Sequence, residues 1–179
     1  MPVYVSMLRG INVSGQKKIS MKDLATLYES QGLTNVRTYI QSGNVVFNAA
    51  GKDSSGLARK IAKAINEAYG FEVPVLVRTR QEMVQTVKKN PFLERKGVDA
   101  TKLHVTFLAQ VPVKERVRQL EAADAGIDQC RVIGSDAYLY CPGGYGKTRF
   151  SNIFIEKQLA VGATTRNWKT VNVLNEMLV

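Results

Sequence analysis

Two polar segments of the sequence combine the residue types that bind anions and polar ligands. Residues 9–18 read RGINVSGQKK and follow a predicted first strand, and residues 41–44 read QSGN between two further predicted strands. Arginine and lysine supply positive charge, amides and hydroxyls supply hydrogen bonds, and glycines let backbone N–H groups approach a ligand closely. This composition indicates an anion-binding or polar-ligand site, but it does not indicate any particular catalyst.

Several side chains in or beside these segments are the primary candidates for ligand contact. They are Arg9, Asn12, Lys17, Tyr39, Gln41, Ser42 and Asn44. Tyr39 could act as an acid or base only if its pKa were shifted, so the sequence assigns no catalytic residue and no cofactor. The alternative interpretation is a tight loop with structural glycines and solvated lysines.

Two segments of the second half provide secondary candidates. Residues 142–149 (PGGYGKTR) resemble a phosphate-binding loop, but Cys141 stands where that loop requires a glycine. Glycines and cations ahead of a helix still favour phosphate binding, and the alternative is a flexible loop followed by an N-cap at Ser151. In residues 162–170 (GATTRNWKT) the threonine pair is predicted to cap the last helix, with Trp168 anchoring its packing. The secondary candidates are Lys147, Arg149, Arg166 and Asn167.

Histidine and cysteine are too scarce for several common kinds of site. His104 is the only histidine, and Cys130 and Cys141 are the only cysteines. A zinc site and a Ser-His-Asp triad are therefore not indicated. The two cysteines are expected to face each other across a hairpin as buried thiols, with a redox pair as the alternative.

The net charge favours anionic partners. It amounts to +10 over 179 residues. We expect a phosphorylated or otherwise anionic small molecule. One alternative is nucleic acid, bound by basic residues on two predicted helices, Arg59, Lys60, Lys63, Arg116 and Arg118. The other alternative is a protein-interaction module without a ligand.

Neither a membrane-spanning segment nor a secretory signal is evident in the sequence. No apolar run reaches the roughly eighteen residues that a membrane span needs. Residues 1–5 enter a predicted strand without a basic and apolar leader. The expected location is the cytoplasm.

Hydrophobic periodicity and turn residues predict a βαββαβ order in the first half, which is that of a ferredoxin-like unit. The predicted strands are 3–8, 36–41, 44–48 and 73–77. The first helix starts at Ser20 and ends at Gly32, and the second starts at Ser54 or Ser55 and ends at Gly70.

The second half repeats this order with one strand missing. A predicted helix over 81–89 and a polar linker lead to strands at 103–109, 128–133 and 137–141 and to helices at 113–123, 150–159 and 165–178. The C-terminal helix is expected to take the place of a fourth strand. The predicted fold class is α+β, with ferredoxin-like units at 1–80 and 103–179 joined by a helix and linker at 81–102. Both sheets are expected to be antiparallel, with helices on one face.

The ferredoxin-like order predicts that the two polar segments meet. Strands one and two of such a unit run parallel, so their carboxyl ends lie at one edge of the sheet. Residues 9–18 and the turn at Ser42-Gly43 are therefore expected to share one rim.

The predicted register of the second hairpin pairs Thr38 with Phe47 and Ile40 with Val45. It places a polar and aromatic set on the sheet face away from the helices, namely Tyr4, Ser6, Leu8, Arg37, Tyr39, Gln41, Asn44 and Val46. We expect this face either to pack against the second unit or to bind a ligand. Tyr4 then stands where RNA-recognition sheets stack a base, although the third strand matches that motif poorly.

Three longer segments form distinctive motifs: residues 8–13 (LRGINV), 38–47 (TYIQSGNVVF) and 164–171 (TTRNWKTV). They resemble the bacterial family catalogued as domain of unknown function 1697, and the resemblance extends over essentially the whole chain. Family members usually carry two glycines after the Asn-Val pair, where this chain has Ser14 in the first position. The resemblance implies an α+β protein of two ferredoxin-like halves, and no established activity, cofactor or catalytic residue.

Overall fold

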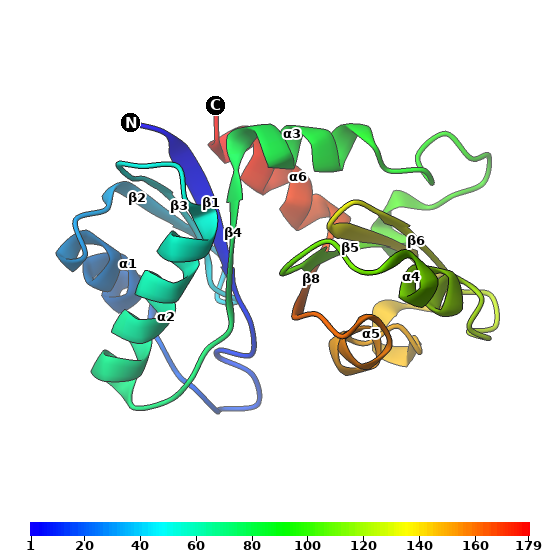
Figure 1. Ribbon diagram of the computed structural model, residues 1–179, viewed down its shortest axis with the longest axis horizontal. Coiled ribbons are helices and arrows are strands. Elements are labelled where there is room, and N and C mark those ends of the chain that lie inside the picture. The colour runs from blue at the N-terminus through cyan, green and yellow to red at the C-terminus, as the bar shows by residue number, and fades with distance from the viewer. The chain divides into compact units, whose positions relative to one another are not determined.

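The computed structural model describes residues 1–179 as two compact units (Figure 1). The first unit comprises Met1–Val84 together with Leu174–Val179, and the second comprises Gln85–Val173. Each contains a four-stranded antiparallel sheet, and the fold is α+β.

The first unit has the βαββαβ order predicted from the sequence. Its elements are β1 Val3–Leu8, α1 Met21–Ser30, β2 Thr34–Tyr39, β3 Asn44–Asn48, α2 Ser54–Tyr69 and β4 Val75–Thr79, followed directly by α3 Arg80–Lys88. The strand order in the sheet is β2-β3-β1-β4. Both β1 and β2 run antiparallel to β3, so they run parallel to each other, as expected.

The second unit repeats this topology with the strand order β6-β7-β5-β8. Its elements are η1 Ala100–Lys102, β5 Leu103–Leu108, α4 Lys114–Glu121, β6 Gln129–Ile133, β7 Asp136–Tyr140, η2 Tyr145–Lys147, α5 Asn152–Leu159 and β8 Ala163–Asn167, followed directly by α6 Trp168–Met177. The duplicated ferredoxin-like fold class is therefore confirmed.

The prediction that the second unit lacks a fourth strand is wrong. β8 pairs with β5 over its whole length, and α6 begins at Trp168, not at Thr165. The adjacent threonines belong to the strand, where β-branched side chains fit well, and do not cap the helix. Asn167 caps α6 instead, because its Oδ1 accepts a hydrogen bond from Thr170 N at 2.8 Å. Trp168 is buried, as predicted.

Equivalent positions of the two sheets make equivalent interactions. The first strand pairs with the fourth at Val5–Arg78 in one unit and at Val105–Arg166 in the other. The first strand also bonds the hairpin turn, through Leu8 N to Gly43 O and through Leu108 N to Ser135 O, each at 2.9 Å. The two units therefore match strand by strand and at the hairpin turn.

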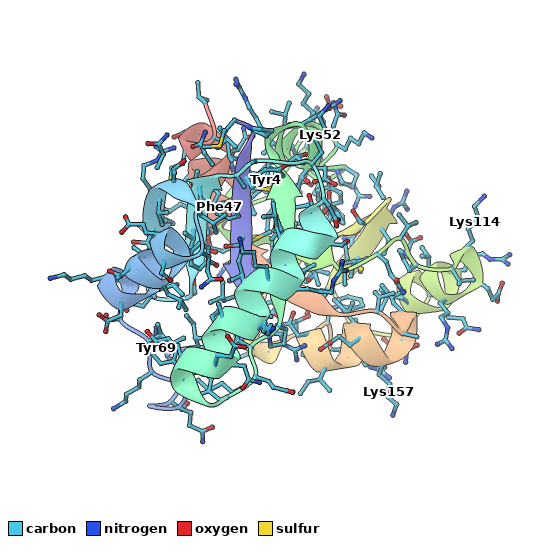
Figure 2. The ribbon with its side chains drawn as sticks, turned by 60° about the vertical axis from the view of Figure 1, so that its left-hand side comes forward. Tyr4, Phe47, Lys52, Tyr69, Lys114 and Lys157 are labelled. Carbon is cyan, nitrogen blue, oxygen red and sulfur yellow. The ribbon has the colours of Figure 1, made fainter.

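The core of the first unit lies on the sheet face that α1 and α2 cover. Tyr4 stacks on Phe47 with ring centroids 5.9 Å apart, and its hydroxyl donates to Gly51 O at 2.6 Å (Figure 2). The prediction that Tyr4, Ser6 and Leu8 lie on the opposite face is wrong, because Tyr4 pairs with Phe47 and shares its side of the sheet. Tyr4 is only 1% exposed, so no RNA base can stack on it.

The predicted hairpin register is also wrong. Thr38 pairs with Val45, not with Phe47, because β2 ends at Tyr39 and Ile40 leaves the strand with a φ of 51°. The turn therefore spans residues 40–43 and is longer than the two-residue turn expected at Ser42-Gly43.

The sheet face away from α1 and α2 is buried where β1 and β3 form it. Val5, Met7, Asn44 and Val46 are 0% exposed on this side. Arg37 donates a hydrogen bond to the backbone oxygen of Met177, which belongs to the same unit. On β1 and β3 this face is therefore interior, whereas Arg37 on β2 is exposed.

The boundary between the two units falls within helix α3. Its residues up to Val84 belong to the first unit, and those from Gln85 onward belong to the second. There Thr86 Oγ1 donates to Asp136 Oδ2 at 2.7 Å, and the Tyr138 hydroxyl donates to Thr86 O at 2.7 Å. These bonds fix the end of α3 to the sheet of the second unit.

Candidate functional site

Asn12 joins the two polar segments at the rim of the first sheet. Its Nδ2 donates to Ile19 O at 2.8 Å and to Gln41 O at 2.9 Å, and its Oδ1 accepts from Ile19 N at 2.9 Å. The loop after β1 and the turn after β2 therefore meet, as the parallel strands predicted. Because both of its N–H groups bond to backbone oxygens, Asn12 positions the rim.

The rim concentrates residues in the left-handed region of backbone conformation. Of the six non-glycine residues with positive φ in the chain, four lie here, with φ between 46° and 55°: Asn12, Ser14, Lys17 and Ile40. Each such residue costs about 1 kcal/mol or more. Turns of this kind orient successive N–H groups into a concavity that binds anions.

An open hollow of about 400 Å³ lies between the loop and the turn. Its lining residues are Asn12, Gly15, Lys18, Ile19, Ser20 and Gln41. Lys18 is exposed and contributes positive charge. Ser20 is the N-cap of α1, since its Oγ accepts from Asp23 N at 3.0 Å, so the hollow lies at the positive end of that helix dipole.

Three of the primary candidates hold the turn between β2 and β3 together by hydrogen bonds to one another. Asn44 is fully buried, and its Nδ2 donates to Tyr39 O and to Ser42 Oγ, each at 3.0 Å. These bonds close the turn between β2 and β3. Asn44, Tyr39 and Ser42 therefore support the rim and do not line its hollow.

Two cationic candidates tie the rim loop to the chain before β4. Lys17 Nζ donates to Glu72 O at 2.6 Å. Arg9 is half-buried, and its backbone N donates to Pro74 O at 3.1 Å. Both charges lie in the rim loop, but neither residue lines the hollow.

The sequence-based candidates omitted Gly15, Lys18, Ile19 and Ser20, which line the hollow. Lys18 and Gly15 stood in the polar segment itself, and Ser20 was recognised only as a helix N-cap. The predicted start of the helix at Ser20 could have identified them. The last residues of a loop that ends at an N-cap lie at the helix N-terminus, which is where anions bind.

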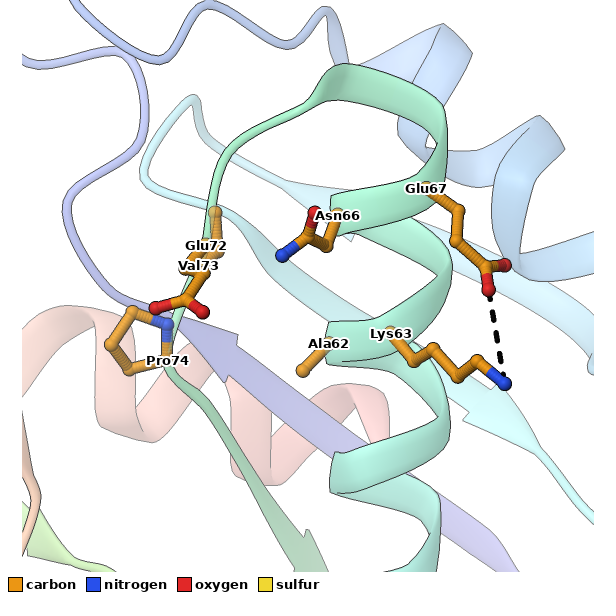
Figure 3. A pocket seen from close by; sticks show the side chains of 7 residues that line it. All are labelled: Ala62, Lys63, Asn66, Glu67, Glu72, Val73 and Pro74. Carbon is orange, nitrogen blue, oxygen red and sulfur yellow. Dashed lines mark ion pairs between the residues drawn. The ribbon is translucent and has the colours of Figure 1, made fainter.

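A second hollow of about 430 Å³ in the first unit lies between α2 and the segment before β4 (Figure 3). Lys63 and Glu67 pair there across one helical turn, at 3.8 Å, and Asn66 points toward the segment that carries Glu72. Two carboxylates against one already paired ammonium group disfavour an anion. The rim hollow is therefore the better candidate for an anionic ligand.

The glycine-rich loop after β7 holds two secondary candidates. Arg149 donates from Nη1 to Asp124 O at 2.6 Å, and its guanidinium lies 4.9 Å from the centre of the Phe154 ring. Lys147 is exposed at the end of η2. Ser151 is the N-cap of α5, as predicted, because its Oγ accepts from Phe154 N at 3.2 Å.

The other two secondary candidates follow each other at the end of β8. Arg166 is buried, its Nη1 donates to Thr165 O at 3.0 Å, and burial lowers the pKa of its guanidinium to about 10. It therefore remains charged at neutral pH. Asn167 uses its side chain to cap α6. The secondary candidates thus occupy two separate segments of the second unit.

The single histidine is part of the packing of the second unit. The ring of His104 stacks on Tyr145 with centroids 4.7 Å apart, and burial lowers the pKa of its imidazole. No group of three or more His, Cys, Asp and Glu side chains is arranged to hold a metal ion. No helix is long and apolar enough to cross a membrane.

The two cysteines are free and buried, but they do not face each other directly as predicted. Cys130 pairs with Leu139, and Cys141 follows the last residue of β7. The hairpin turn lies at Gly134-Ser135, one residue earlier than the expected Ser135-Asp136, so the thiols are offset along the strands.

We expect both thiols to resist chemical modification in the folded protein. Burial raises the pKa of Cys130 and of Cys141, so the reactive thiolate is scarce at pH 8. Reaction with a disulfide reagent should be at least about tenfold slower than in the denatured chain, since each pKa unit lowers the thiolate fraction tenfold. Absorbance of the released thiol measures both rates, and equal rates would contradict the expectation.

The basic residues considered for nucleic acid all have partners within the protein. On α2, Arg59 lies 3.8 Å from Asp53, Lys63 pairs with Glu67, and Lys60 donates to a backbone oxygen. On α4, Arg116 donates to Gln158 O and Arg118 pairs with Glu115. Such exposed contacts are typical of solvated helix faces, and nothing in their geometry singles out nucleic acid.

Comparison with known proteins relates the chain to a family of unknown function and to one solved bacterial structure. The model of a family described as "Protein of unknown function (DUF1697)" matches residues 1–138. No curated protein matches the chain. Among solved structures, the conserved bacterial protein SP0830 from Streptococcus pneumoniae is 21% identical, and the match covers 99% of each chain with a TM-score of 0.78. At this identity the likeness supports the fold alone.

Proposed function

Because the chain belongs to the DUF1697 family of proteins of unknown function, its site must be judged on its own geometry, and we propose that it binds an anionic or phosphorylated small molecule at the rim of the first sheet. The ligand would occupy the hollow between the loop after β1 and the turn after β2. The proposal concerns binding and assigns no reaction.

The observation that carries this proposal is the left-handed loop that Asn12 holds around the hollow. Four non-glycine residues there adopt unfavourable backbone conformations, and the hydrogen bonds of one amide hold loop and turn together. Strained backbone held by its surroundings is common at ligand sites, where it preorganises donors. Lys18 and the N-terminus of α1 add positive potential at the same place.

The charge of the ligand follows from the groups available at the hollow. Its lining contains one ammonium group and no carboxylate. Arg9 and Lys17 lie in the same loop and raise the positive potential further. A phosphate or carboxylate group on a polar molecule is the chemistry that these groups recognise.

A thermal-shift screen with inorganic phosphate, sugar phosphates and nucleotides, at low and physiological salt, tests the proposal. We expect one compound to raise the melting temperature at both salt concentrations. Lys18→Ala should then weaken its affinity about tenfold, which corresponds to the loss of one charge-assisted hydrogen bond. Arg9→Ala combined with Lys17→Ala should weaken binding less than Lys18→Ala does, because these two charges lie in the rim loop but outside the hollow, and the protein should still unfold cooperatively.

The matched control is Lys52→Ala, which removes an exposed lysine in the loop before α2 (Figure 2). It should leave affinity unchanged. Equal affinity of the Lys18 variant and the Lys52 variant would refute the rim site. Shifts only with oligonucleotides, lost at physiological salt, would indicate a generic basic surface instead.

The same proposal includes a cytoplasmic location. Its support is the pair of buried free thiols, which suits a reducing compartment. A small phosphorylated ligand would also be available there.

A further inference from the structure

The second unit also has a hollow beside the loop that joins its first strand to its first helix. In the first unit the hollow lies between the loop from β1 to α1 and the turn from β2 to β3. In the second unit a hollow of about 740 Å³ lies between the loop from β5 to α4, helix α4 itself and the turn from β6 to β7. Both hollows thus lie beside the first loop and the hairpin turn of their unit, but the second extends along α4 and β6.

The chemistry of this second hollow differs from that of the first. Its loop contributes Val111 and Pro112, α4 contributes Val117, and β6 contributes Val132 and Ile133. Val111 is 70% exposed and Ile133 is 37% exposed, so a ligand in the hollow could reach both apolar side chains. The volume falls within the range of small-molecule sites, which are mostly lined by apolar side chains.

Positive charge surrounds this apolar lining. Lys114 and Arg131 both line the hollow, and neither forms an ion pair. Arg118 also lines it and pairs with Glu115, an exposed contact that solvent weakens. The one lining carboxylate, Glu121, accepts a hydrogen bond from Val132 N at 2.9 Å and so remains tied to the backbone of β6.

We infer that this hollow binds an organic acid with an extended apolar body. The hydrocarbon part would lie against Val111, Val117 and Val132, and the acid group would meet Lys114 and Arg131. Apolar area removed from water supplies the affinity, and two unpaired cations select the charge of the head group. The inference does not depend on the rim site of the first unit, which shares no residue with it.

Fluorescence titration of the full chain with 8-anilinonaphthalene-1-sulfonate, an apolar aromatic sulfonate, tests the inference. We expect Val111→Asp and Arg131→Gln each to raise the Kd of this probe about tenfold. The matched controls in the same unit are Ile153→Asp and Arg116→Gln. Ile153 is 73% exposed, close to the 70% of Val111, so Ile153→Asp measures the effect on probe binding of a new surface carboxylate outside the hollow. Neither Ile153 nor Arg116 lines the hollow. Circular dichroism of all variants checks that they fold.

Competition with octanoate and octan-1-ol then tests the head group. Octanoate should displace the probe at about one-tenth of the concentration that octan-1-ol requires, because only the acid meets the cations. Equal displacement by acid and alcohol, or equal Kd values for Val111→Asp and Ile153→Asp, would overturn the inference. Lys18→Ala should leave probe binding unchanged, which keeps this result separate from the test of the rim site.

Discussion

Replacing Asn12 by alanine should lower the free energy of unfolding by about 3 kcal/mol, since three hydrogen bonds disappear and alanine tolerates a positive φ less well than asparagine. The side chain of Asn12 bonds Ile19 twice and Gln41 once, and its φ is 55°. Losing it leaves two backbone oxygens and one N–H without their partner. Urea denaturation of the purified protein measures the change.

Two further variants at this position separate the causes. Asn12→Gly removes the same hydrogen bonds but accepts the left-handed backbone, so it should cost about 1 kcal/mol less than Asn12→Ala. Asn12→Asp keeps the acceptor for Ile19 N and loses both donors. A change below about 0.5 kcal/mol for Asn12→Ala, the usual range for surface substitutions, would show that the rim is not held by this amide.

Gly43→Ala should also destabilise the protein, by about 3 kcal/mol, because two costs coincide at this turn. Gly43 has a φ of +83°, and a Cβ built there would lie 2.7 Å from Ile11 Cδ1 and 2.9 Å from Leu8 Cβ. Ile11 of the rim loop and Leu8 of β1 therefore both lie too close to Gly43 to admit a Cβ atom. Thermal and urea denaturation measure the loss.

Gly10→Ala is the matched control for the steric part of this effect. Gly10 has a similar φ of +76°, but a Cβ there would meet nothing within 4 Å. It should cost only about 1 kcal/mol, from backbone strain alone. The double variant Gly43→Ala, Ile11→Val should recover part of the loss, since valine lacks the Cδ1 atom. Equal costs at Gly10 and Gly43 would contradict the packing explanation.

The sequence predicted the architecture well because turns and periodicity are local signals. Ser20, Gly32 and Gly70 correctly bounded helices in the first unit, and the parallel course of β1 and β2 predicted that residues 9–18 meet the hairpin turn. Those inferences need only chain order and strand direction. They do not depend on the packing of individual side chains.

The errors arose where tertiary packing decides between local alternatives. Thr164 and Thr165 suit either a helix N-cap or a strand, and pairing with β5 settles the choice. Tyr4 was assigned to the wrong face because alternation along β1 does not reveal which of its two alternating sets of side chains faces the helices. The roles of Asn12 and Asn44 as internal hydrogen-bonding groups were equally invisible, because an amide that binds a ligand and one that binds backbone look alike in sequence.

The assignment of Leu174–Val179 to the first unit has a consequence for how the protein forms in the cell. Synthesis on the ribosome proceeds from the N-terminus, so the first sheet emerges long before the last helix turn that belongs with it. Arg37 obtains its bond to Met177 O only after residue 177 has left the ribosome. The first unit therefore leaves the ribosome exit tunnel without Leu174–Val179, and until these residues emerge, the incomplete unit is a target for chaperones and proteases.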